Sequence, residues 1–217
     1  QGGRYAYRNQ PGIAHWNLAC LAQTLVPLLH EDGEQAVALA QEAVDTFAPQ
    51  FQQAHNRGMA RKLGLGELTD EDTTLVEELF QIMAEQRCDF TLTFRRLADL
   101  AEPAGTATDT SAKDVSRVYE LPDALLPWLA RWRARLALDP ADAAQRQAAM
   151  YAANPVFIPR NHLVAQAIEA AQDRGDYQPF NELVDVLADP WTFDEQLARY
   201  ATPPAPEQVV RQTFCGT

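Results

Sequence analysis

The chain has 217 residues, enough to enclose one sizeable core, and 47% of them are apolar, which excludes disordered and fibrous proteins. Its formal net charge of −12 argues against a nucleic-acid partner, because proteins that follow phosphates present a basic face. Three cysteines, Cys20, Cys88 and Cys215, are too few and too far apart for a disulfide scaffold or a C-x-x-C zinc site, so we expect a reducing, cytoplasmic setting.

The sequence was searched for a membrane-spanning segment and for a signal peptide. No uninterrupted apolar run reaches the roughly 18–20 residues that cross a bilayer, so we expect no membrane partner. The opening residues lack the pattern of a signal peptide, and the chain does not begin with Met. We therefore expect a fragment of a longer protein.

Residues 1–34 combine an extended segment with a helix. Aromatic and basic side chains alternate over residues 4–8, which is the two-residue period of an extended chain. Pro11-Gly12 then predicts a corner, and a helix is expected from Ile13 to about Leu29. This helix is apolar on more than one face, which predicts that other elements enclose it and that Asn17 binds a neighbouring backbone.

The rest of the chain shows helical spacing almost throughout, and the fold class is predicted to be all-α. Mostly small and polar residues over 101–113 predict a loop, and Pro203-Pro204 predicts an extended tail. The expected helices lie at about 35–61 (one helix kinked at Pro49, or a helix and its successor), 70–83, 91–100, 125–138, 140–151, 159–171 and 177–187. The expected caps are Thr69 or Asp70, Asp89 or Thr91, Asp139 and Asp176 at helix starts, and Gly64 and Gly175 at helix ends.

The helix predicted over 125–138 carries three alternating arginines, Arg131, Arg133 and Arg135. They allow two interpretations, an anion-binding site or a solvated basic face. The second is favoured, because basic residues on an acidic protein are usually solvated surface charges.

Two groups of residues form recognisable motifs. The first group is Gly3, Arg4, Tyr5, Asn9, Gln10 and Pro11, followed by Trp16 and Asn17. The second group, in the C-terminal half, includes Asn154, Pro155, Arg160 and Asn161. With these residues the chain resembles the selenoprotein O (SelO) family of pseudokinase-like protein adenylyltransferases.

The resemblance implies an enzyme that transfers AMP from ATP to Ser, Thr or Tyr hydroxyls of other proteins. In the family the first group of residues follows the kinase-like active site. The resemblance thus assigns residues 1–34 to the end of the kinase-like C-lobe, 35–200 to a helical C-terminal region and 201–217 to a proline-rich tail. It places ATP and Mg or Mn on the upstream lobe and no catalytic, cofactor-binding or metal-binding residue in this chain. The expected partners are that lobe and protein substrates.

The cysteines receive different interpretations. Family members commonly end with a redox residue third from the C-terminus, and Cys215 has that position, so the resemblance implies a redox role. The alternative is an incidental thiol. Cys20 and Cys88 are expected to be packing residues.

Two other functions remain open at this point. One is a freestanding helical interaction or regulatory module, which a monomeric, cooperatively melting domain would favour. An exposed apolar patch over residues 13–29 would instead indicate a missing lobe. The other is a metal-dependent hydrolase on a helical bundle, which would require bound metal. It is disfavoured because the four histidines, His15, His30, His55 and His162, lack the spacing of a zinc motif.

Overall fold

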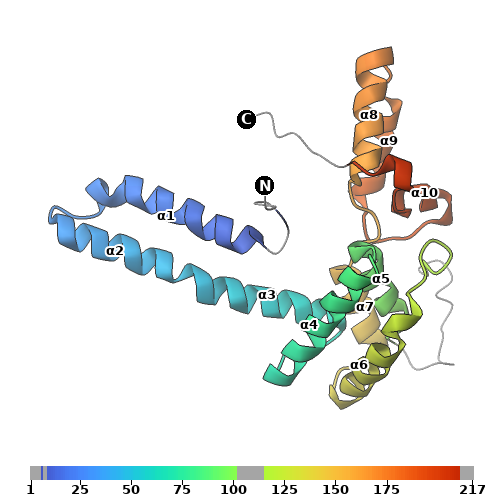
Figure 1. Ribbon diagram of the computed structural model, residues 1–217, viewed down its shortest axis with the longest axis horizontal. Helices are drawn as coiled ribbons and strands as arrows, with labels where there is room; N and C mark the ends of the chain where they lie inside the picture. Colours follow the sequence, from blue (N-terminus) through green and yellow to red (C-terminus); the bar gives the residue numbers. More distant parts are fainter. Residues whose placement is uncertain (1–5, 7–8, 102–114, 211–217) are drawn as a thin grey trace. The chain divides into compact units, whose positions relative to one another are not determined.

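The computed structural model describes residue 6, residues 9–101 and residues 115–210. The chain divides into two compact units, residues 1–58 (unit 1) and 59–217 (unit 2), which are described separately. The described residues are mainly helical and contain no strand, which confirms the all-α class (Figure 1). Of the segment expected to be extended, residues 4, 5, 7 and 8 lie outside the described residues.

Unit 1 contains a pair of packed helices, α1 (Gln10–Leu29) and α2 (Gly33–Asp45) (Figure 1). Helix α1 begins three residues earlier than expected, because Pro11 suits the first turn of a helix and does not force a corner before it. The carboxylate of Asp32 caps α2 by accepting hydrogen bonds from the N–H groups of Glu34 at 2.8 Å and Gln35 at 3.1 Å.

The stretch expected to be helical over 35–61, as one kinked helix or as a helix and its successor, contains two helices. Helix α2 ends at Asp45, and α3 (Phe47–Leu63) starts after Thr46. Pro49 therefore lies in the first turn of α3, where a missing N–H costs no internal hydrogen bond, and the break comes before it instead of a kink at it. Residues 59–63 of α3 belong to unit 2.

Unit 2 contains the other helices. They are α4 (Asp70–Glu85), α5 (Phe90–Asp99), α6 (Leu126–Leu138), α7 (Ala143–Ala153), α8 (Asn161–Arg174), α9 (Gln178–Ala188) and the short α10 (Ala198–Ala201). Helices α8 and α9 pack side by side as a hairpin (Figure 1).

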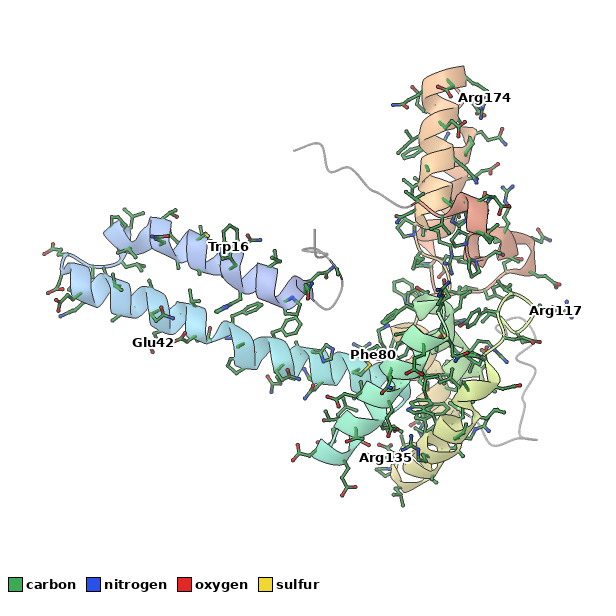
Figure 2. All side chains as sticks on the ribbon, in the orientation of Figure 1. Trp16, Glu42, Phe80, Arg117, Arg135 and Arg174 are labelled. Atoms are coloured by element: carbon green, nitrogen blue, oxygen red, sulfur yellow. The ribbon has the colours of Figure 1, made fainter. Side chains whose placement is uncertain are left out.

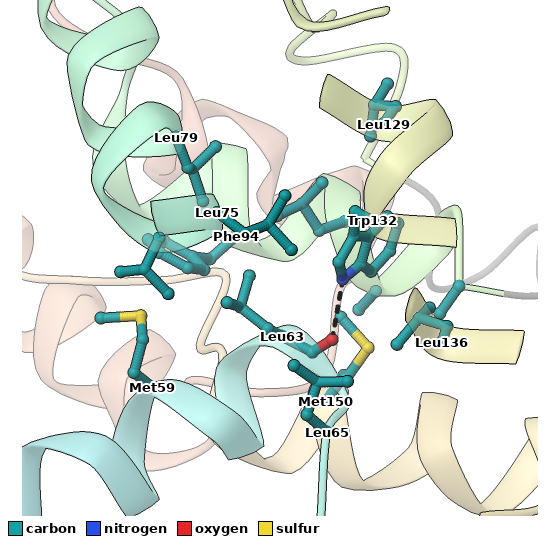
Figure 3. Packing of buried hydrophobic residues seen from close by; sticks show 14 of the residues in the cluster. Met59, Leu63, Leu65, Leu75, Leu79, Phe94, Leu129, Trp132, Leu136 and Met150 are labelled. Carbon is teal, nitrogen blue, oxygen red and sulfur yellow. Dashed lines mark hydrogen bonds between the residues drawn. The ribbon is translucent and has the colours of Figure 1, made fainter. Parts of the chain in front are cut away.

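The main core of unit 2 is built around two stacked tryptophans of α6. Trp128 and Trp132 have ring centroids 5.9 Å apart, and both are buried. The indole N–H of Trp128 donates to the carbonyl of Leu75 at 2.7 Å. The indole N–H of Trp132 donates to the carbonyl of Leu63 at 3.0 Å (Figure 3). Because buried indole N–H groups need an acceptor, these bonds fix α6 against α3 and α4 while the rings fill the core. A second core, around Phe157 and Phe193, packs under α9.

Two of the expected N-caps are wrong. Helix α7 is capped by Asp142, not Asp139; Asp139 ends α6 and accepts N–H bonds from Gly66 at 3.0 Å and Ala141 at 3.0 Å. Helix α9 begins at Gln178 after Tyr177, although Asp176 still accepts the N–H of Gln178. The caps at Thr69 and Asp89 are confirmed, as are the left-handed glycines Gly64 and Gly175.

The connection between α6 and α7 is held by Arg146. Its Nη2 donates to three backbone carbonyls, those of Leu136 at 3.1 Å, Asp139 at 3.1 Å and Ala141 at 2.9 Å. One buried guanidinium thus satisfies the carbonyl groups of a turn that has no regular structure.

Candidate functional site

The residues predicted to form the first family motif lie at the start of unit 1. Asn9 precedes α1, and Gln10 and Pro11 form its first turn. Trp16, labelled in Figure 2, follows on the same helix and is exposed. Asn17 comes next and is also exposed. Gly3, Arg4, Tyr5 and the redox candidate Cys215 lie outside the described residues.

Helix α1 is apolar and exposed. None of its residues is buried, and among the described residues it is the helix long and apolar enough, with a mean hydropathy of 1.2, to cross a membrane by length and composition. The core helix of a soluble protein meets the same criterion. The enclosing elements expected for α1 are not supplied by the described residues, and the exposed Asn17 corrects the expectation of a buried amide.

The second family motif lies in unit 2, where Asn154 ends α7 and is 1% exposed. Its side-chain N–H donates to the Lys62 carbonyl at 3.0 Å, and its side-chain oxygen accepts from Lys62 Nζ at 3.2 Å. Arg95 donates to the Asn154 carbonyl at 3.1 Å and lies 4.2 Å from the ring centre of Tyr151, whose hydroxyl donates to Asp99 at 2.8 Å. We call these five residues the Asn154 cluster.

The Asn154 cluster satisfies the end of α7. Lys62 Nζ also donates to the carbonyl of Ala153 at 3.1 Å, so two cations from α3 and α5 meet the carbonyl groups at this helix end. Burial lowers the pKa of Lys62 and of Arg95. The side chains of Lys62 and Arg95 thus donate to backbone carbonyls, and the cluster joins α3, α5 and α7.

A second buried polar group surrounds Asp89, the N-cap of α5. Arg160 donates to both of its carboxylate oxygens, at 2.7 and 3.3 Å, and the Leu92 N–H donates to Oδ1 at 2.9 Å. The Tyr119 hydroxyl accepts the Asp89 N–H at 3.2 Å and lies 3.1 Å from Thr93 Oγ1. Burial raises the pKa of Tyr119 to about 12. Asp89, Thr93, Tyr119 and Arg160 form the Asp89 cluster, which links α5 to the start of α8.

The remaining motif residues have simpler settings. Pro155 directly follows α7 and ends it, as expected for a residue pair that disfavours helix. Asn161 is the exposed first residue of α8. Its neighbour His162 is buried, and burial together with the positive charge of Arg160 lowers its pKa.

The arginines of α6 do not form an anion site. Arg131 pairs with Glu78, and Arg135 donates to both oxygens of Asp72, at 2.8 and 3.0 Å. Arg133 donates to the carbonyl of Leu100 at 3.4 Å. The three arginines therefore bind groups of unit 2, so the face is less freely solvated than expected.

The other histidines lie in unit 1. His15 stacks on Phe47 with ring centroids 5.7 Å apart, and His55 stacks on Phe51 at 6.0 Å. Over residues 9–101 and 115–210, no three His, Cys, Asp or Glu side chains gather closely enough to hold a metal ion. Cys20 and Cys88 are both free and half-buried.

Sequence reasoning missed the partners that give Asn154 and Arg160 their roles. Arg95 lies on the apolar side of α5, between Leu92 and Ala98, and it is fully buried. An arginine at a core position of an amphipathic helix could have predicted a buried polar contact, because a buried charge needs a partner. Its acceptors could not have been found, since they are backbone oxygens 56 and 59 residues away.

The chain resembles known proteins over its whole length. The model of the family "Protein adenylyltransferase SelO" matches residues 1–188. "Protein nucleotidyltransferase YdiU" of Rhodopseudomonas palustris (strain BisB18) is 50% identical over 215 residues, which cover 99% of this chain and 43% of that protein. The protein of the same name from Rhizobium meliloti (strain 1021) is 48% identical over 217 residues, 100% of this chain and 43% of that protein. The chain therefore spans less than half the length of these curated relatives.

Proposed function

Because the chain belongs to the SelO family of protein adenylyltransferases, we propose that it is the helical C-terminal part of an enzyme that transfers AMP from ATP to protein hydroxyls. The acceptors are Ser, Thr or Tyr side chains. In this reaction the hydroxyl oxygen bonds to the α-phosphorus of ATP, pyrophosphate leaves, and the hydroxyl proton passes to a base.

The proposal assigns the nucleotide chemistry to a portion of the protein that this chain does not cover. AMP transfer needs cations on the phosphates and a metal held by carboxylate or amide ligands. Among the described residues, the cations Lys62, Arg95 and Arg160 donate to carbonyls or to Asp89, and no three His, Cys, Asp or Glu side chains gather closely enough to hold a metal ion. ATP and Mg or Mn are thus proposed for the intact protein only. This assignment is consistent with the length of the relative from Rhodopseudomonas palustris, which is more than twice as long as this chain.

The observation that carries the proposal is the exposed apolar surface of α1. Trp16, Leu21 and Leu28 are 55%, 54% and 80% exposed, and no residue of the helix is buried. A helix that is apolar on several faces is normally enclosed, and a large exposed apolar patch marks a site of packing. Four residues of the first family motif, Gln10, Pro11, Trp16 and Asn17, lie on this helix. We therefore propose that α1 packs against the catalytic portion and completes the lower part of a kinase-like lobe.

Labelling with ATP carrying ³²P at the α-phosphate tests the proposal. The intact protein should transfer label to a protein acceptor in the presence of Mg, whereas purified residues 1–217 should not. Trp16→Asp and Leu21→Asp in the intact protein should reduce labelling, because they place charges in the proposed contact. Leu138→Asp is the matched control, since this apolar residue at the end of α6 is 81% exposed. Labelling by residues 1–217 alone would contradict the proposal.

Three finer expectations remain part of this proposal. Cys215 acts in redox pairing, the protein works in the cytoplasm, and its partners are proteins, not nucleic acids or membranes. Mass spectrometry of the intact protein under non-reducing conditions tests the first. A Cys215 that stays a free thiol in the oxidised protein would remove that role.

A further inference from the structure

The outward side of α9 carries an apolar stripe. Leu183 and Val186 on the inner side are buried in the second core. On the outer side Tyr177, Phe180 and Val184 are each half-exposed or more, at positions i, i+3 and i+7. We call these three residues the α9 patch. A helix that is apolar on two sides is normally covered on both, and the described residues leave the α9 patch open.

The stripe has the dimensions of a helix contact. Seven residues of helix rise about 10 Å, so the α9 patch covers two turns, and a second helix could contact it through residues of the same spacing. Helices α8 and α9 already pack side by side in a hairpin (Figure 2). A third helix on the outer side of α9 would make this hairpin a small bundle.

The α8–α9 hairpin, which carries the α9 patch, is negatively charged. Residues 161–189 contain six carboxylates and one arginine, Arg174, so this stretch of 29 residues carries nearly half of the net charge of −12. Glu182 is partly neutralised by Arg199 at 2.7 Å. Asp185 directly follows Val184 and is exposed. The six carboxylates are those of Glu169, Asp173, Asp176, Glu182, Asp185 and Asp189.

We propose that the α9 patch binds a basic amphipathic helix of a partner protein. The apolar side of that helix covers Tyr177, Phe180 and Val184, and its lysines or arginines lie beside the carboxylates. The charge disfavours other occupants. Nucleic acid and anionic membranes would be repelled, and a symmetric dimer through this patch would bring two acidic surfaces together. The proposal does not depend on AMP transfer.

A designed peptide tests the proposal on the intact protein. The probe is a fluorescein-labelled, 18-residue peptide of Leu and Lys whose leucines recur every three or four residues, and binding is followed by fluorescence polarisation. Two control peptides keep its length: one has the same composition with the leucines dispersed, and the other has Glu in place of Lys. Three variants are compared with the wild type. Phe180→Ala removes apolar contact, Asp185→Lys reverses a charge, and Leu138→Ala changes an exposed apolar residue elsewhere.

The expected result is binding of the Leu/Lys peptide only. Phe180→Ala should weaken it by about tenfold, the effect of losing much of one aromatic contact. Asp185→Lys should weaken it several-fold at about 50 mM salt and much less at about 500 mM, because salt screens the charge. Leu138→Ala should have no effect. Thermal melting confirms that each variant is folded, and Asp185→Lys, on the surface, tests the site even if Phe180→Ala is unstable.

Four outcomes would overturn the proposal. They are equal binding of the Glu peptide or of the dispersed peptide, unchanged binding by both patch variants, no binding to the intact protein, and a wild-type dimer that Phe180→Ala dissociates. The third would mean that another part of the protein covers the α9 patch. The fourth would assign the patch to a second copy of the chain.

Discussion

Replacing Gly64 by alanine probes how closely the end of α3 packs on α7. Gly64 has φ +73°, in the left-handed region that favours glycine. An added Cβ would lie 2.6 Å from Met150 Sδ and 2.9 Å from Arg146 Cγ. The Met150 thioether can move, but Arg146 is held by three backbone carbonyls at 2.9–3.1 Å. Relief of the contact therefore costs hydrogen bonds or backbone displacement.

The expected loss has two parts. A non-glycine residue in the left-handed region costs about 1–2 kcal/mol, and overpacking a filled site costs typically about 1–3 kcal/mol. Gly64→Ala should thus lower the free energy of unfolding by roughly 2–5 kcal/mol. Gly175→Ala is the matched control, because Gly175 has φ +64° and its Cβ would meet no described atom within 4 Å. It should lose only the backbone part, about 1–2 kcal/mol.

The assay is urea unfolding followed by tryptophan emission, since Trp128 and Trp132 report on the core of unit 2. Both variants should keep the same dependence on urea concentration and differ in midpoint. Equal losses for Gly64→Ala and Gly175→Ala would refute the reasoning, because they would show that the close approach to Arg146 and Met150 has no energetic effect.

Three further changes test the polar clusters. Asn154→Ala should lower the free energy of unfolding by about 1–3 kcal/mol, because it leaves buried polar groups without hydrogen-bond partners. Asn161→Ala, at an exposed position, should change the free energy of unfolding by less than about 0.5 kcal/mol. Urea unfolding measures both. Arg160→Met should cost about 3–5 kcal/mol by leaving the Asp89 carboxylate without its cation, and the double change with Asp89→Leu should recover part of it in the same assay. Burial alone would raise the pKa of Asp72, but hydrogen bonds from Arg135 and Thr69 hold this pKa below its usual value. The ionised carboxylate therefore stabilises the folded protein above about pH 4, and this stabilisation is lost on further acidification. Thermal melting from pH 6 to pH 2 should therefore show a smaller acid-induced loss for Asp72→Asn than for the wild type.

The results that would contradict these three differ. For Asn154 it is a loss no larger than that of Asn161→Ala. For the Asp89 cluster it is an Arg160→Met variant as stable as Arg174→Met, the exposed control on α8. For Asp72 it is an identical pH profile in the two proteins.

Local signals predicted the helices well because they act over a few residues. The N-caps at Thr69 and Asp89 and the stops at Gly64 and Gly175 depend on backbone groups within one turn. The start of α7 was misplaced because Asp139-Pro140 has the pattern of a cap, while tertiary bonds to Gly66 and Arg146 use Asp139 to end α6. The bond to Gly66 joins residues 73 positions apart, so it leaves no local pattern in the sequence.

The clusters around Asn154 and Asp89 could be predicted only in part. The resemblance selected Asn154 and Arg160, but the sequence does not show that Lys62, Arg95 and Asp89 are their partners. These contacts depend on how α3, α5, α7 and α8 pack, and packing is set by many weak contacts together. The exposure of α1 was anticipated as one of two outcomes, because an apolar helix without its neighbours must show its surface.

The hydrogen bonds from Arg146 to the turn between α6 and α7 determine which residues there can be substituted during evolution. The turn offers the guanidinium three main-chain oxygens and the Asp139 carboxylate at 3.6 Å, and Ala141 contributes only its carbonyl, so Ala141 can change identity freely as long as that carbonyl stays in place. Position 146 has no such freedom, since one buried guanidinium nitrogen, Nη2, binds all three carbonyls and a shorter or uncharged side chain would leave them unsatisfied. Inserted residues would move these oxygens away from that nitrogen. Engineered tags and split points therefore belong at the open turn around Gly175, where nothing described lies within 4 Å of an added side chain.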